Sequence, residues 1–166
     1  MSIEATELEK IIKFLTDELG GDWFLTGGSL VKLAFDQSRG TEDVDFLRLA
    51  HPELSENKSK HLLYQWLIAN GLGPEWVNTA VEAFVQDIPE WQKEVVLLRE
   101  GNRGRLYRPT LTLFVYLKLR RGTEIDLADV QCAIPFCTEG FDKHKFLSWA
   151  DEKTADRLKS CRTLFG

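Results

Sequence analysis

The sequence predicts an α/β fold of the α+β kind, in which helices pack against one small mixed β-sheet. Its 166 residues suit one domain with its own core. Two short segments have strand character and lie on either side of a glycine turn: a buried strand at 23–26, and a strand at 43–49 that begins with two acids and continues apolar. Apolar residues at helical spacing occupy stretches before and after these two segments. We therefore expect a single domain over 1–166, with its core at about 23–134 and helices at about 141–165.

Composition and charge narrow the class of protein. Hydrophobic residues make up 43% of the chain and charged residues 28%, which is typical of globular proteins. The net charge of −5 argues against broad nonspecific nucleic-acid binding, although a local basic patch could still hold an RNA end. Three cysteines without paired spacing indicate reduced thiols and no zinc site. With no apolar run of membrane-spanning length and no basic-then-apolar leader, we expect a cytoplasmic protein that contacts no membrane.

The first chemical motif is a strand, a glycine turn and a short helix. Residues 23–26 predict a buried strand, Gly27 and Gly28 a tight turn, and Ser29 the N-cap of a helix over 30–35. Two glycines let the backbone approach a ligand closely, and a helix start favours a phosphate. The Ser29 hydroxyl adds a hydrogen-bond donor. Gly27, Gly28 and Ser29 are therefore predicted to bind the phosphates of a nucleotide.

The second motif is an acidic strand start. On a strand over 43–49, Asp43 and Asp45 project to the same side while Val44 points into the core. Two carboxylates near a phosphate cradle suit Mg²⁺ or Mn²⁺, which take oxygen ligands from the protein and from substrate phosphates. Alone, either motif is usually a plain turn or a solvated strand end. Their order in one chain predicts that Asp43 and Asp45 are catalytic metal ligands.

These motifs resemble a known family. Leu25-Thr26-Gly27-Gly28-Ser29 followed by Thr41-Glu42-Asp43-Val44-Asp45 looks like the signature of the nucleotidyltransferase superfamily, whose fold polymerase-β-like enzymes share. A closer similarity is to the small bacterial abortive-infection nucleotidyltransferase toxins and their uncharacterised relatives. Three later stretches are also similar: 71–78, 114–121 and 124–130. The resemblance therefore covers about residues 23–134. The resemblance implies a minimal nucleotidyltransferase fold, an NTP substrate, RNA or protein as acceptor, and an antitoxin-like protein partner.

One lysine lies on the apolar face of a predicted helix. The spacing of 111, 114, 115 and 118 puts Lys118 on this face, in a helix that Pro109 opens. The resemblance implies that Lys118 is a catalytic residue that contacts the triphosphate. Snorkelling, or an ion pair with Asp126, remains open. Asp126 and Asp129 lie at i and i+3 on the next helix, and Asp126 is the second residue expected near the nucleotide.

The third carboxylate of polymerase-like enzymes has no clear counterpart. Those enzymes usually place it on a neighbouring strand. Residues 94–99 predict a strand buried on both faces, with 105–107 as its hairpin partner, and this strand offers only Glu94 and Glu100 at its ends. Two alternatives to catalysis therefore stay open: a non-catalytic nucleotide- or protein-binding module of the same fold, and an antitoxin-like partner of another protein.

The remaining elements carry structural predictions. We expect helices over 3–19, 55–69 and 74–85, the first ended by two glycines and the last begun by Pro74. Arg39 either meets a phosphate or lies in solvent. Three tryptophans either stack on a base or belong to the core: Trp66, Trp76 and Trp91. Two short C-terminal helices are expected to bury five apolar residues: Phe146, Leu147, Trp149, Leu158 and Leu164.

Overall fold

The computed structural model describes residues 2–161 and 165. Its centre is a five-stranded mixed sheet with the order β3-β2-β1-β5-β4. The central strand β1 (Gly21–Thr26) pairs antiparallel with β2 (Val44–Ala50) and parallel with β5 (Gly104–Pro109). The sheet is completed by β3 (Val77–Asn78), parallel to β2, and β4 (Val95–Glu100), antiparallel to β5. The expected small mixed sheet is confirmed.

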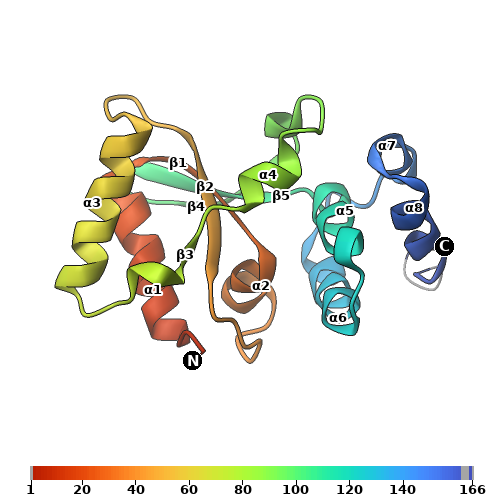
Figure 1. Cartoon of the computed structure of the whole chain (residues 1–166), viewed down its shortest axis with the longest axis horizontal. Coiled ribbons are helices and arrows are strands. Elements are labelled where there is room, and N and C mark those ends of the chain that lie inside the picture. The colour runs from red at the N-terminus through yellow and green to blue at the C-terminus, as the bar shows by residue number, and fades with distance from the viewer. Residues whose placement is uncertain (1, 162–164, 166) are drawn as a thin grey trace.

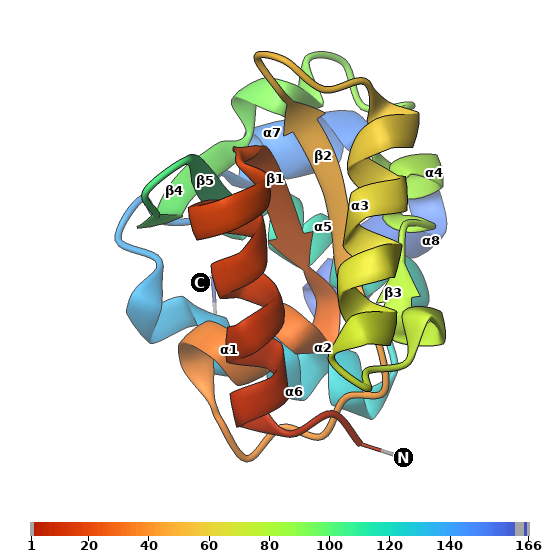
Figure 2. The ribbon, with the colours of Figure 1, turned by 90° about the vertical axis from the view of Figure 1, so that its left-hand side faces the viewer.

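Helices flank this sheet in two groups. Figures 1 and 2 show α1 and α3 side by side over one face of β1 and β2, with α5 to α8 on the far side of the sheet. The long helices are α1 (Ala5–Lys13), α3 (Glu56–Ala69), α5 (Leu111–Arg121) and α6 (Glu124–Ala133). The short ones are α2 (Gly27–Leu30), α4 (Val81–Val85), α7 (Lys143–Trp149) and α8 (Glu152–Lys159). Single π-helical turns prolong α1 over Phe14–Leu19 and α2 over Val31–Phe35.

The core lies between the sheet and both groups of helices. Phe24 of β1 and Phe46 of β2 are almost fully buried, as is Phe114 of α5. Burial of a side chain of this size stabilises a fold by about 1.5–3 kcal/mol. Of the two roles predicted for the tryptophans, the structure shows packing in the core: Trp91 packs edge-on against Phe24, Trp66 stacks on Phe14, and Trp76 packs against the core. The helices are thereby fixed against the sheet that carries the acidic strand.

Three element predictions are wrong. A helix does not run from Pro74 to residue 85: a 3₁₀ turn (Pro74–Trp76) leads into β3, because Val77 and Asn78 pair with β2, and α4 follows. Pro109 ends β5, and the Thr110 hydroxyl caps α5 by accepting from the Leu113 N–H. β4 is an edge strand and none of its residues is buried, so the prediction of burial on both faces is wrong; Leu97 is 48% exposed.

The C-terminal helices α7 and α8 form as expected. They bury Phe146 and Leu158, and Trp149 packs on Tyr116 of α5. Leu147 is exposed, contrary to its predicted core position, and Leu164 lies outside the described residues. Cys132, Cys137 and Cys161 are free thiols. Across residues 2–161 and 165, no helix has both the length and the apolar character needed to cross a bilayer.

Candidate functional site

The turn after β1 is built around a glycine that no other residue can replace without strain. Gly27 has φ +69°, a conformation that side chains with a Cβ rarely adopt. A Cβ at this position would overlap Oδ2 of Asp45 and lie 2.9 Å from its Cγ. Gly27 therefore allows the turn and the acidic strand to approach each other closely.

Ser29 joins this turn to β2. Its buried hydroxyl donates to the Thr26 carbonyl at 2.9 Å and accepts from the Asp45 N–H at 3.1 Å. The helix begins at Gly27 and its N-cap is Thr26, so the prediction that Ser29 is the N-cap is wrong. The only proton of the Ser29 hydroxyl is engaged in the turn. The geometry thus assigns Ser29 to holding Asp45 in place.

The two acids take different environments at the start of β2. Asp43 is exposed and directly precedes the strand, while Asp45 is half-buried opposite Thr26 of β1. Burial raises the pKa of Asp45, a hydrogen bond from Asn78 Nδ2 to Asp45 Oδ1 at 2.8 Å opposes this, and the charge of Asp43 raises it further. The two acids therefore repel each other as anions, and a bound cation would relieve that repulsion.

β2 lies between β1 and β3, and β3 places an amide beside the acidic strand. Asn78 is the register partner of Asp45. Glu94 directly precedes β4 and Glu100 is its last residue, and β1 and β5 separate β4 from β2. Glu94 accepts from Thr110 and Lys145 there, so neither glutamate joins the site. The sequence pattern missed Asn78, although it ends the 71–78 stretch on which the family resemblance partly rested.

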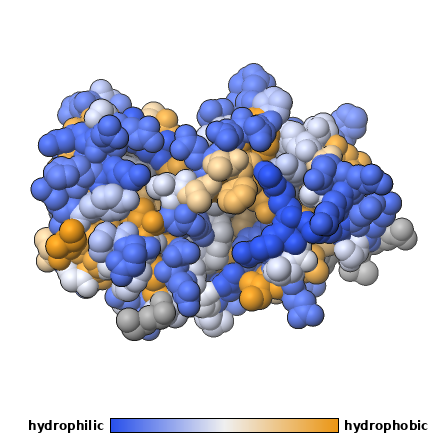
Figure 3. Space-filling model, in the orientation of Figure 1, coloured by the Kyte–Doolittle hydropathy of each residue, from blue (hydrophilic) through white to orange (hydrophobic). Residues whose placement is uncertain are grey.

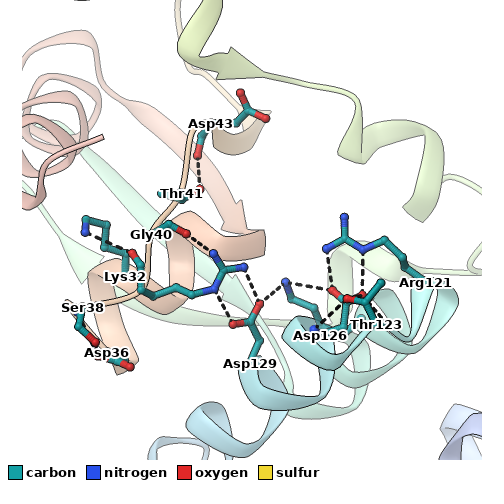
Figure 4. Close-up of polar contacts among 12 residues, drawn as sticks. Lys32, Asp36, Ser38, Gly40, Thr41, Asp43, Arg121, Thr123, Asp126 and Asp129 are labelled. Atoms are coloured by element: carbon teal, nitrogen blue, oxygen red, sulfur yellow. Dashed lines mark hydrogen bonds and ion pairs between the residues drawn. The ribbon is translucent and has the colours of Figure 1, made fainter. Parts of the chain in front are cut away.

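A row of alternating charges borders the acidic strand. Figure 4 shows Asp129 and Asp126 between cations, with Asp43 apart from them. Lys118 Nζ lies 2.7 Å from Asp129 Oδ2 and 3.7 Å from Asp126 Oδ1, and Lys118 is only 7% exposed. The ion-pair alternative for Lys118 is therefore what the structure shows, with Asp129 as the nearer partner.

Arginines occupy both ends of this row. Arg39 donates to both carboxylate oxygens of Asp129, at 2.8 and 3.0 Å, and its guanidinium lies against Gly28 of the turn. Arg39 is thus not a solvated loop residue. Arg121 donates two 2.8 Å hydrogen bonds to Asp126. Burial tends to raise the pKa of Asp126, but the bonds from Arg121 and from Thr123 outweigh it and lower the pKa to about 2. This carboxylate stays ionised.

These parts surround one pocket of about 630 Å³. Gly27, Gly28, Asp43 and Asp45 line its sheet side, and Lys118, Arg121 and Asp126 its helical side, whereas Ser29 is not part of its wall. The structure therefore brings together six of the seven residues predicted for the site. It adds residues that the sequence reasoning missed: Asn78, Phe84 and Arg120.

Comparison with known proteins agrees with this geometry at the level of the fold. No protein-family model matches the sequence, and no curated protein matches it. The structure is similar to that of an antigenic nucleotidyltransferase-like protein from Paracoccidioides brasiliensis, with a TM-score of 0.53. The fold is nucleotidyltransferase-like. The alignment covers 96% of this chain and 85% of the fungal one at 14% identity, so the likeness extends over the sheet and both helical groups.

Proposed function

We propose that this protein is a metal-dependent nucleotidyltransferase, which moves a nucleotidyl group from an NTP to an acceptor hydroxyl. The observation that carries this proposal is the shared pocket. Asp43 and Asp45 line it together with the glycine turn, and Lys118 and Arg121 line the opposite side. Carboxylates, backbone N–H groups and cations are the three kinds of group that a metal-bound triphosphate requires.

The donor set fits a metal that arrives with the nucleotide. Within residues 2–161 and 165, no group of three or more His, Cys, Asp or Glu side chains could hold a metal ion. Mg²⁺ commonly binds one or two carboxylates and completes its shell with water and substrate phosphates. Asp43 and Asp45 would hold Mg²⁺ or Mn²⁺ in this way, and the ion would neutralise charge that develops around the α-phosphorus.

The other residues would bind and orient the triphosphate. The N–H groups of Gly27 and Gly28 lie at a helix start. The charge row that contains Lys118 and Arg121 has three cations against two carboxylates, so it keeps a net positive charge beside the pocket. In the transfer, the acceptor hydroxyl would lose its proton to water and its oxygen would bond to the α-phosphorus, while the bond from the α-phosphorus to the oxygen that bridges to the β-phosphorus breaks and pyrophosphate leaves. Ser29 and Asn78 would act indirectly, because both hydrogen-bond to Asp45.

One observation favours the alternative of a non-catalytic nucleotide-binding module. Among the residues that the structure describes, no third carboxylate lines the pocket beside Asp43 and Asp45 apart from Asp126, which is ion-paired. The residue that adjoins Asp45 is the amide Asn78, whose own Oδ1 accepts from the Ala80 N–H. A site with two carboxylates can still bind a metal–nucleotide complex without promoting transfer. The toxin-type resemblance adds RNA or protein as acceptor to the proposal and an antitoxin-like protein as partner.

Asp45→Asn tests the function. Asparagine keeps an acceptor for the Asn78 amide and removes the charge, so the fold should persist. Thermal unfolding is followed with each NTP, with and without Mg²⁺, and transfer is assayed on RNA and protein acceptors. At a hundred times its dissociation constant a ligand adds about 2.7 kcal/mol, which raises the midpoint by several degrees. We expect this Mg²⁺-dependent shift, and any product, in the parent but not in the variant.

Asp87→Asn is the matched control, because it removes one exposed carboxylate that does not line the pocket. It should leave the shift and the product unchanged. Full transfer by Asp45→Asn would overturn the mechanism. A metal-dependent shift in the parent without product on either acceptor would favour the binding module.

A further inference from the structure

The pocket has an apolar wall that the phosphate and metal groups leave unused. Val81 and Phe84 of α4 and Leu117 of α5 line it, facing the same space as Asp43 and Asp45. Phe84 is 49% exposed, although large aromatic side chains are usually buried. In Figure 3 a pale-orange patch lies at the centre of this face, next to a deep-blue hydrophilic stretch. The pocket therefore combines one apolar side with a strongly polar remainder.

Phe84 is held in position although it is exposed. Arg120 of α5 donates a 2.9 Å hydrogen bond to the Phe84 carbonyl, which ties α4 to α5. The Arg120 guanidinium carbon also lies 5.4 Å from the centre of the Phe84 ring and 5.7 Å from that of Tyr116. These distances are typical of cation–π contacts. An aromatic ring fixed at the mouth of a polar pocket is a preorganised surface for a flat apolar ligand.

We propose that Phe84, with Val81 and Leu117, binds the nucleobase of the NTP by stacking, an inference that rests on the proposed function. A nucleoside triphosphate has one flat base and one chain of charged phosphates. The pocket offers a matching division, with the apolar wall on α4 and the carboxylates, glycine turn and cations elsewhere. Every base has a π-face, so this contact raises affinity for all four NTPs over a ligand without a base.

The test compares a nucleotide with a ligand that lacks both the base and the ribose, and the Phe84 variants isolate the part of the difference that stacking on the base contributes. Mg²⁺–ATP and Mg²⁺–tripolyphosphate are titrated calorimetrically into the parent, Phe84→Ala, Phe84→Trp and Phe136→Ala. Phe136 is the matched control, since it is 53% exposed and lies outside the pocket wall. Stacking on one aromatic ring increases affinity about 5- to 140-fold. We expect the parent and Phe136→Ala to prefer ATP by such a factor, Phe84→Trp to keep the preference, and Phe84→Ala to lose it.

The outcomes separate this inference from the proposed function. If the parent binds both ligands equally, the inference is overturned while the phosphate site stands. If Phe84→Ala weakens both ligands by one factor, Phe84 supports the fold of the pocket and does not stack on the base, which also overturns the inference. If neither ligand binds the parent, the proposed function and the inference are both refuted.

Discussion

Gly27→Ala separates the two reasons for which the turn requires glycine. The first is the backbone, because a residue with a Cβ at φ +69° is destabilised by about 1–2 kcal/mol. The second is contact, since the new methyl group would displace the Asp45 carboxylate and break its hydrogen bond with Asn78. Loss of a hydrogen bond to a charged group is worth about 1.5–3 kcal/mol. We therefore expect a total loss of about 2.5–5 kcal/mol.

Urea unfolding measures this loss, and Gly71→Ala supplies the control. Gly71 has φ +70°, almost the same as Gly27, but a Cβ there would meet nothing within 4 Å. Its substitution should therefore show the backbone contribution of about 1–2 kcal/mol alone. The difference between the two variants is the contribution of the contact with Asp45.

A double-mutant cycle with Asp45→Ala closes the argument. In an Asp45→Ala background the carboxylate is absent, so Gly27→Ala should destabilise the protein by little more than Gly71→Ala does. The reason is that Gly27 and Asp45 act through direct contact. Equal losses for Gly27→Ala and Gly71→Ala would refute the reasoning. That result would mean that the acidic strand does not need the space that Gly27 leaves.

Two further predictions concern the charge row. The side chain of Asp129 is 2% exposed and is the shared partner of two cations, so Asp129→Ala should lower the free energy of unfolding by about 3–5 kcal/mol. The control is Glu90→Ala, which removes an exposed ion pair and should change the free energy of unfolding by less than about 0.5 kcal/mol. Equal urea midpoints for the two variants would contradict this prediction. The pKa of Asp126 is lowered from 3.8 to about 2, so its ionised form stabilises the fold fully above about pH 4, and this stabilisation is lost as the pH falls toward 2. Asp126→Asn should flatten the loss of stability between pH 5 and pH 2.5 relative to the parent, and parallel curves would show that Asp126 is not its source.

The parts of the fold that the sequence predicted correctly are local. The glycine turn, the strand before it and the acidic strand after it are set by residues within a few positions of one another, and the structure has them as expected. Lys118 was predicted on a buried helix face from spacing alone, and it lies there at 7% exposure. Period and turn chemistry suffice for such features.

The features that the sequence missed depend on pairing across long separations. β3 is two residues long and is a strand only because it pairs with β2. Arg39 and Asp129 are 90 positions apart, so no spacing rule connects them. Four consecutive apolar residues predict that β4 is buried on both faces, but in the structure none of its residues is buried and Leu97 is exposed. Each of these cases depends on contacts between segments far apart in the sequence, and such contacts are a property of the whole chain.

Asn78 has a further consequence for how metal and nucleotide would bind. The pKa of Asp45 is raised by burial and by the charge of Asp43, so a third carboxylate beside it would add repulsion in the absence of metal. An amide at this position instead donates to Asp45 Oδ1 and stabilises the charged form. Two acids of this kind hold a cation weakly by themselves, and phosphate oxygens would supply the remaining ligands. Under the proposed function, the metal and the NTP therefore bind as one complex, and neither ligand alone should protect the protein from unfolding as strongly as both together.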